Sequence, residues 1–496
     1  MGVNKAVYIP PYMCSTPFFP SLRAQLARLG KRTTTALRQL DFLPLCEQFR
    51  DLLPAHLLAA EEEGPGSRER IFSLRLTLEG FIWQVLKPNT ACREVVRAVQ
   101  ALFQSHGWGT VAEDSSSYMQ ARQSLSEYRL KRTLAVTAET ADRRVGSQGF
   151  IQGRPVKVAD GSTLQLADTA QNQKSYAQAP GQKPGCGFPL LKFLPLFSLS
   201  SGAISHVETA DWKTHDVRLL KPAWDALKKG DVLLVDRAFG DYVTLASLPP
   251  RGVDVVARLH GARQVDFRKP LKRLGPRDAW FEFHKSDQPS AILTPEEWAQ
   301  VPAKITVRMV RFTARIRGRK VRVTLVTTLL DPVLYPAEEL VAWYRRRWQM
   351  ELTLRHLKTT MKMEQLRCQS PAMARKELLV YLLAYNLIRC LMAEAVAQAG
   401  VEMERVSFRG TVDAVRNYAA EMRAARSQRQ RKRLWEDLVA VIAADLVPTR
   451  PGRTEPRAVK HRPKAYPLLN KPRRKFKEIP HRYRQRKNKT INKSRA

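Results

Sequence analysis

The hydrophobic periodicity of the chain changes near residue 150, and this change sets the order of its folding units. Before that point, apolar residues recur three and four positions apart, as in amphipathic helices, over 76–86, 91–103 and 117–125. After it, residues 156–160 alternate apolar and polar side chains, as a half-buried strand does. We therefore predict a helical N-terminal region over residues 1–145, followed by a domain built on a sheet.

The third of these helical segments suggests a role for the N-terminal region. It begins at a run of three serines suited to capping a helix. Its pattern predicts four exposed side chains able to contact DNA: Tyr118, Gln120, Arg122 and Gln123. We therefore predict a DNA-binding region, with a plain packing role as the alternative.

Strand and helix patterns then follow one another in an order typical of a mixed sheet. Residues 188–199 and 203–209 are apolar strands on either side of a Ser-Ser-Gly turn, which predicts a hairpin. After them come a helical pattern, a short apolar strand, a second helical pattern and a last strand, over 214–227, 231–235, 239–248 and 253–259. This order predicts a mixed α/β sheet flanked by helices over residues 151–259.

Residues 260–335 interrupt this domain. They carry polar turns and two alternating segments, 305–316 and 321–329, so we predict a β-rich insertion. Pro336 suits the first turn of a helix, and the apolar spacing predicts one long helix from there past Met361. A second long apolar helix, over 374–399, is predicted to lie in the core, and residues 336–400 thus return the chain to the sheet domain.

The C-terminal part differs in composition. Residues 401–448 predict helices, and 408–446 would form either a dimer contact or a packing subdomain. Residues 449–496 contain 18 Lys or Arg and 2 acidic residues, with many prolines and few apolar side chains. We expect this basic tail to be disordered alone and to order on phosphate.

The whole chain is strongly basic, which indicates a polyanionic partner. Its 496 residues carry a formal net charge of +38, with a pI near 10.4. Self-repulsion of this size opposes a compact state unless an anion neutralises it, and phosphates contacted by Lys and Arg do so in nucleic-acid complexes. We predict a nucleic acid as partner; a basic ribosome-associated protein is the alternative.

Two further classes are disfavoured. The six cysteines are scattered and form no CxxC pair, so no zinc site is indicated. We find no signal peptide, and the most apolar run, 188–199, is interrupted by Lys192 and Pro195 and is too short to span a bilayer. We expect a cytoplasmic protein with no membrane partner.

Two aspartates come directly after predicted strands. Asp160 ends the run Val-Lys-Val-Ala-Asp, and Asp236 ends the run Val-Leu-Leu-Val-Asp. An acid in this position is held at the edge of a sheet, where α/β proteins place their sites. Asp also caps turns, so one such acid means little, but two favour a metal site.

A third acid lies among cations in the long predicted helix. At about 100° per residue, its polar residues fall within an arc of roughly 60° beside an apolar stripe. These residues are Tyr344, Arg347, Glu351 and Lys358. One carboxylate among cations and a phenol suits a site that binds both metal and phosphate. A surface ladder of helical salt bridges, such as Arg347 with Glu351, is the alternative.

The spacing Tyr-x2-Arg-x3-Glu-x6-Lys, filled by these four residues, resembles the YREK signature of insertion-sequence-four-type DDE transposases. Trp348, after Arg347, also fits. Asp160 in Asp-Gly-Ser and Asp236 in Val-Asp-Arg resemble the first and second acids of that family. The resemblance covers about residues 75–395. It implies an RNase H-like catalytic domain with a β-rich insertion between the second Asp and the Glu, in agreement with the segments above.

The resemblance implies cut-and-paste DNA transposition. Asp160, Asp236 and Glu351 would be the catalytic residues and would hold two Mg2+ ions, for which Mn2+ can substitute. The implied steps are nicking of the element end, hairpin formation by the freed 3′ hydroxyl, hairpin hydrolysis and strand transfer. The implied partners are the terminal inverted repeats, target DNA and a second copy of the chain, at the bacterial nucleoid.

Further residues are implied as DNA contacts. Tyr344, Arg347 and Lys358 resemble residues that grip phosphates on the 5′ side. A hairpin needs a displaced base, and Trp280 or Trp298 of the insertion would stack on it, although each tryptophan is more often part of a core. Arg237 would contact DNA or support the site.

Two other functions share these features. An RNase H-like nuclease without strand transfer would have the same acids but has no evident need for Tyr344 and Lys358 at this spacing. A catalytically inactive DNA-binding derivative would bind DNA alone, and the intact set of three acids argues against it.

Overall fold

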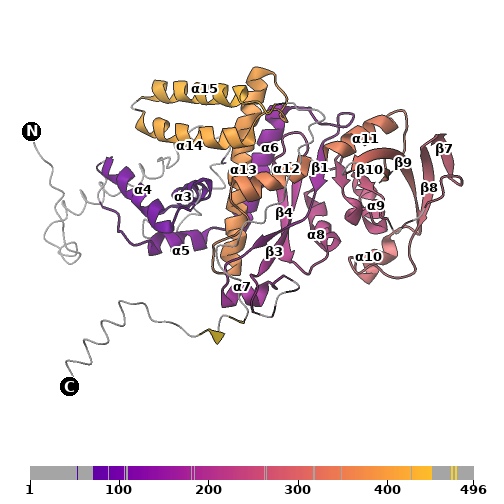
Figure 1. Cartoon of the computed structure of the whole chain (residues 1–496), viewed down its shortest axis with the longest axis horizontal. Coiled ribbons are helices and arrows are strands. Elements are labelled where there is room, and N and C mark those ends of the chain that lie inside the picture. The colour runs from indigo at the N-terminus through magenta and orange to yellow at the C-terminus, as the bar shows by residue number, and fades with distance from the viewer. Residues whose placement is uncertain are drawn as a thin grey trace, which may run out of the picture.

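The computed structural model describes residues 71–448 except 88, 106, 108–109, 180, 182, 184, 262, 264, 317–318, 348 and 426, and also Leu53, Lys471, Pro472, Lys475 and Phe476. Most of the predicted basic tail and of the first 70 residues, and Trp348, lie outside the described residues. Figure 1 shows helices α3, α4 and α5 on one side of a long helix, α13, and the sheet on its other side.

Helices open the described chain, close to the predicted positions. They are α3 (Leu74–Leu86), α4 (Cys92–Ser105), α5 (Ser116–Ser124) and α6 (Glu127–Val145). The hydroxyls of Ser73 and Ser126 accept hydrogen bonds from backbone N–H groups in the first turns of α3 and α6. These side-chain caps explain where both helices begin.

The predicted exposed face of α5 is partly wrong. Tyr118 and Arg122 are buried, because α5 packs against α3 and the Tyr118 ring lies 5.3 Å from that of Phe72. Gln120 and Gln123 are exposed as predicted. Two of the four side chains proposed for DNA contact therefore serve packing instead.

A mixed sheet forms the centre of the molecule. Its first strands are β1 (Val156–Ala159), β2 (Ser162–Gln165), β3 (Leu190–Ser198), β4 (Ile204–Asp211), β5 (Val232–Val235) and β6 (Asp254–Arg258). β1, β5 and β6 are parallel, and β3 runs antiparallel between β1 and β4. The order β4-β3-β1-β5-β6, with β3 alone reversed, is that of the RNase H-like fold, as predicted.

The segment 260–335 is rich in strands, as expected, and it extends the same sheet. It contains β7 (Lys272–Gly275), β8 (Asp278–His284), the short helix α10 (Pro295–Gln300), β9 (Lys304–Ile316) and β10 (Arg319–Thr327). β10 pairs antiparallel with β6, with Val326 opposite Ala257. Backbone hydrogen bonds therefore connect the insertion to the central strands.

Helices cover both faces of the sheet. α6 and α13 (Pro371–Ala399) pack on the face that includes Val158 and Leu234. α8 (Asp216–Ala223) and α9 (Tyr242–Ser247) pack on the face that includes Leu233 and Val235. Successive residues of β5 are thus buried on opposite sides, which explains its continuous apolar run.

α13 is the one helix of the described chain that is long and apolar enough to cross a membrane, and 89% of its most apolar window is buried inside the protein. It was predicted as a core helix, and its contacts agree. It packs along α6 and against α14 (Phe408–Ala424) and α15 (Gln428–Ala444). Figure 1 shows α14 and α15 side by side next to α13.

The long helix predicted from Pro336 past Met361 is divided in the structure. α11 (Ala337–Arg346) ends before residue 348, and α12 (Gln349–Arg355) follows. His356–Thr360 then form a π-helical turn. Such a turn rotates the residues after it relative to a regular α-helix. The regular helix on which the predicted common arc of Tyr344 and Lys358 depends is therefore interrupted.

A buried ion pair joins the insertion to the start of α11. Arg308 is 0% exposed and binds both carboxylate oxygens of Asp278, at 2.9 and 2.5 Å. Its remaining nitrogen donates to the backbone carbonyls of Tyr335, at 2.6 Å, and Asp331, at 3.2 Å. Arg308 thereby holds the loop that precedes α11.

We predict that Asp278→Ala destabilises the protein by about 3–5 kcal/mol, because it leaves the buried Arg308 charge without its carboxylate. The urea midpoint of the full chain, followed by tryptophan fluorescence, measures the loss. Asp278→Leu with Arg308→Met should cost clearly less, since neither charge is then buried. Equal losses for the single and double variants would contradict this account.

Candidate active site at the sheet edge

The parallel pairing of β1 with β5 brings two acids together. Ala159 lies opposite Val235 in this pair, and the next residues along the two strands are Asp160 and Asp236. Asp236 is also the N-cap residue of a 3-10 turn, Arg237–Phe239, yet its side chain makes no capping hydrogen bond. Its carboxylate oxygens are therefore available to a ligand.

The Arg347 guanidinium lies between these two acids. Its terminal nitrogens are 3.9 Å from a carboxylate oxygen of Asp160 and 3.8 Å from one of Asp236. The arginine side chain is 8% exposed, whereas those of Asp160 and Asp236 are 24% and 37% exposed. Arg347 thus pairs with the two strand-end acids. The alternative, a ladder of salt bridges along the helix, requires a pair between Arg347 and Glu351, and none is found among the described ion pairs.

Glu351 reaches the same site from α12. Its residue is exposed, and its negative charge is near enough to contribute to the raised pKa of Asp160. Both other predicted acids therefore act electrostatically on Asp160. The third comes from an element more than a hundred residues away from the second in the chain.

The pKa of Asp160 lies above its ordinary value. Burial at the sheet edge is the main cause, and the charges of Asp236 and Glu351 add to it. Arg347 and the Gly161 backbone N–H act in the opposite direction. Asp160 therefore takes up a proton at a higher pH than an ordinary aspartate does.

Tyr344 and Arg347 both present buried polar atoms without a partner. The Tyr344 hydroxyl and the Arg347 Nε have no hydrogen-bond partner of normal geometry within the described part of the chain. The two side chains are adjacent, with the guanidinium 5.5 Å from the phenol ring. Burial raises the pKa of Tyr344, so its hydroxyl stays a donor at neutral pH. An anionic oxygen would satisfy both groups.

Lys358 is not brought to the acids in the same way. It lies in the π-helical turn, half-buried, and none of the described ion pairs includes it. Burial lowers its pKa, and the charge of Glu364 partly offsets this effect. Of the four residues of the Tyr-Arg-Glu-Lys pattern, the first three therefore interact with the two strand-end acids or with each other. For Lys358 no described ion pair with these acids is found.

Arg258 is a site residue that the sequence analysis missed. It ends β6, which pairs with β5 so that Ala257 lies opposite Val235. Arg258 therefore lies next to Asp236 while still paired with Leu325 of β10, and its charge acts to lower the pKa of Tyr344, which burial raises. The sequence signal was weak, because Arg258 lies within the predicted strand 253–259, whereas the two aspartates come directly after theirs.

The two tryptophans proposed as stacking partners are engaged in packing. Trp280 on β8 donates its indole N–H to the Leu330 carbonyl, and Lys272 lies 4.9 Å from its ring centroid. Trp298 on α10 packs against the core, with Lys285 4.6 Å from its ring centroid. These contacts favour a structural role for both rings. Arg237, in contrast, is exposed next to Asp236.

The carboxylates fit a divalent cation by their chemistry, because oxygen ligands suit Mg2+ and Asp236 is free of capping bonds. Across the described ranges, however, no three His, Cys, Asp or Glu side chains lie close enough to hold one ion. The Arg347 guanidinium occupies the space between the aspartates. An ion shared by both acids requires this side chain to move aside.

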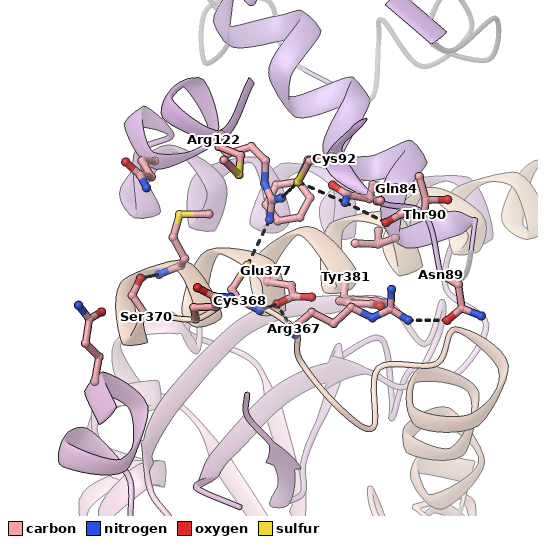
Figure 2. A pocket seen from close by; sticks show the side chains of 18 residues that line it. Gln84, Asn89, Thr90, Cys92, Arg122, Arg367, Cys368, Ser370, Glu377 and Tyr381 are labelled. Carbon is pink, nitrogen blue, oxygen red and sulfur yellow. Dashed lines mark hydrogen bonds between the residues drawn. The ribbon is translucent and has the colours of Figure 1, made fainter. Parts of the chain in front are cut away.

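A cavity of about 520 Å3 lies away from these acids. It is formed between the N-terminal helices and the start of α13 (Figure 2). Arg122 crosses it, donating to the sulfur atoms of Cys92 and Cys368 at 3.0 and 3.2 Å. Its lining includes Arg122 and Gln123, two of the side chains predicted to contact DNA, but none of the three acids. We interpret the cavity as part of the boundary between the helical region and the sheet domain.

Comparison with known families agrees with the predicted class of protein. A family model described as a transposase DDE domain matches residues 151–387, which contain the whole sheet, the three acids and the start of α13. This segment, 237 of the 496 residues, therefore matches the transposase DDE domain family, and the match supports a DNA transposase as the class of protein.

The chain is also similar to individual transposases. It is 25% identical over 363 residues to the transposase InsG for insertion sequence element IS4 of Escherichia coli (strain K12), covering 72% of this chain and 78% of InsG. A solved structure of the piggyBac transposase synaptic complex with hairpin DNA matches with a TM-score of 0.40 and 11% identity, over 84% of this chain and 88% of the other. The predicted family, the insertion-sequence-four-type transposases, is confirmed by the first relative and the domain match.

We predict that Arg347→Met raises the pKa of Asp160 further, because it removes the positive charge that lowers this pKa. Protonation of Asp160, seen by NMR of 13C-labelled aspartate carboxyls, should then occur at a higher pH than in the unmodified protein. Arg346→Met is the control, since Arg346 pairs with the distant Glu404 at 2.7 Å. An unchanged Asp160 titration in Arg347→Met would contradict the assigned contact.

Proposed function

We propose that the chain excises an insertion sequence and inserts it into new DNA, with Asp160, Asp236 and Glu351 as the catalytic carboxylates. The main support is the register of β1 and β5, which sets two acids side by side at the sheet edge. A third carboxylate from α12 acts on the same group. The transposase DDE domain match over these residues supplies the class of substrate.

The three acids would hold two divalent cations. Mg2+ fits such a set of oxygen ligands and Mn2+ can replace it. When bound, the ions supply a nucleophile at neutral pH and stabilise the leaving 3′ oxygen. For this to occur the acids must be ionised, and the charge of the bound cations would favour the ionised form.

Arg347 and Tyr344 would hold a DNA phosphate next to the cut. Each has a buried polar atom without a partner, and a phosphate oxygen accepts hydrogen bonds from both types of group. When Arg347 turns toward a phosphate, it leaves the space between the aspartates to the cations. Arg258 lies beside them at the end of β6 and would add a second positive charge, with Lys358 and Arg237 at the borders of the site.

The remaining parts of the reaction are proposed from the family resemblance. Cleavage of the second strand would proceed through a DNA hairpin, and the 3′ ends would then be joined to target DNA. Two DNA ends must be paired, so we propose a homodimer, with the α14–α15 pair as a candidate contact. The protein would act on DNA in the bacterial cytoplasm.

The test uses purified full-length chain, Mg2+, a DNA fragment ending in the inverted repeat found beside the gene, and a target plasmid. We predict cleavage at the repeat and joining to the plasmid. Asp236→Asn and Glu351→Gln should each lower both steps by roughly 10²–10³-fold or more, as expected for loss of a charged catalytic group, while DNA binding remains.

Asp225→Asn is the matched control, because Asp225 is an exposed acid that pairs with Arg251 away from the site. It should cleave and join as the unmodified chain does. Cleavage without joining would instead identify a nuclease, and full activity in Asp236→Asn would refute the site assignment.

A further inference from the structure

A groove leads away from Asp236 and is lined by cations. One cavity, of about 370 Å3, includes Arg237, Asp241, Tyr242, His260 and Arg263 in its walls. A second, of about 340 Å3, continues from Arg263 along β8, past Lys269 and Phe283. Because Arg263 lines both cavities, we treat them as one surface and name it the Arg263 groove.

Arg263 is a half-buried cation without a carboxylate partner among the described residues. Its guanidinium lies over the Phe283 ring, 4.2 Å from the centroid, which holds it in a fixed position. Burial lowers its pKa, with the charges of Asp241 and Tyr242 acting in the opposite direction. A charge that is partly removed from water and left unpaired is stabilised by an incoming anion.

The acids near the groove are already engaged. The oxygens of Asp241 accept hydrogen bonds from the Thr244 backbone N–H, at 3.1 Å, and from the Thr244 hydroxyl, at 2.8 Å. Asp266 pairs with Arg268 at 3.1 Å, and Glu282 pairs with Lys304 at the same distance. In the described part of the chain, no such pair involves Arg237, Arg263 or Lys269. The groove therefore carries a net positive charge.

The groove begins at the residue after a catalytic acid. Arg237 follows Asp236 directly, so a strand whose scissile phosphate lies against Asp236 passes the mouth of the groove. We propose that the Arg263 groove binds backbone phosphates of the DNA strand that is cut, on the side where this strand leaves the acids past Arg237. This inference rests on the proposed function, because DNA is its substrate.

The residues that line the groove indicate how it would bind DNA. Arg263 and Lys269 would contact phosphate oxygens, and Arg263 would do so with a guanidinium that Phe283 already orients. These contacts are to the backbone, so they position the strand without reading its bases. The β-rich insertion would thereby guide the strand, in addition to carrying the loop that leads to α11.

The test measures salt dependence of DNA binding by the full-length chain in EDTA, so that no cleavage occurs. The probes are a fluorescent 20-nucleotide oligo-dT strand and a 20-base-pair duplex of random sequence. Loss of one phosphate contact should reduce the slope of log affinity against log salt by about 0.7 for the single strand and about 0.9 for the duplex. Arg263→Met should show this reduction and a several-fold weaker affinity.

Three variants make the result specific. Arg263→Met keeps the aliphatic stem over Phe283, so packing is largely preserved, and thermal unfolding checks this. Arg263→Lys restores the charge and should restore most of the slope. Arg251→Met also removes one positive charge, but Arg251 pairs with Asp225 at the opposite end of β6, so its slope should stay at the original value.

Equal slopes for Arg263→Met and Arg251→Met would overturn the proposal. This failure is separate from failure of the proposed function, because the catalytic assignment is tested by cleavage. If Asp236→Asn still cleaves DNA while Arg263→Met reduces the slope, the groove is supported as a DNA-binding surface and the catalytic assignment is refuted. If Asp236→Asn is inactive and Arg263→Met binds as the unmodified chain does, only the groove is rejected.

Discussion

The active site depends on the parallel pairing of β1 with β5. Because Ala159 lies opposite Val235, Asp160 and Asp236 leave the sheet next to each other. Two acids at a partly buried edge repel one another, and the raised pKa of Asp160 reflects this together with burial. The Arg347 guanidinium offsets the repulsion by lying between them. In the proposed reaction the Arg347 guanidinium would turn to a DNA phosphate, and divalent cations would take its place between the aspartates.

The position of Arg347 depends in turn on the insertion. Arg308 and Trp280, on β9 and β8, bind the backbone carbonyls of residues 330, 331 and 335, just before α11 begins. Tyr344 and Arg347 lie at the other end of that helix. β10 pairs with β6, so the strands that carry Arg308 and Trp280 belong to the same sheet as the strand that ends in Arg258. The insertion therefore supports the helix that carries Tyr344 and Arg347, and it contributes Arg263 to the proposed DNA-binding groove.

Within the described residues, part of the positive charge is paired with carboxylates and part is not. Arg251, Arg346 and Arg375, away from the acids, each pair with a carboxylate. Around Asp236 the situation differs, because the Arg237 and Arg263 side chains line a cavity whose one acid, Asp241, caps a helix. Such a distribution suits an enzyme whose substrate supplies the missing negative charge.

Local patterns in the chain were enough to find the strands that carry the aspartates and to identify α13 as a core helix. The burial of a strand or helix is visible in the spacing of its own apolar residues. They were also enough to single out Asp160, Asp236, Arg347 and Glu351. They could not reveal the break between α11 and α12, the burial of Tyr118, or the roles of Arg258 and Arg263. These features arise from contacts between distant segments. Periodicity shows which side chains avoid water, but the neighbour that covers each of them depends on how the strands and helices pair in three dimensions.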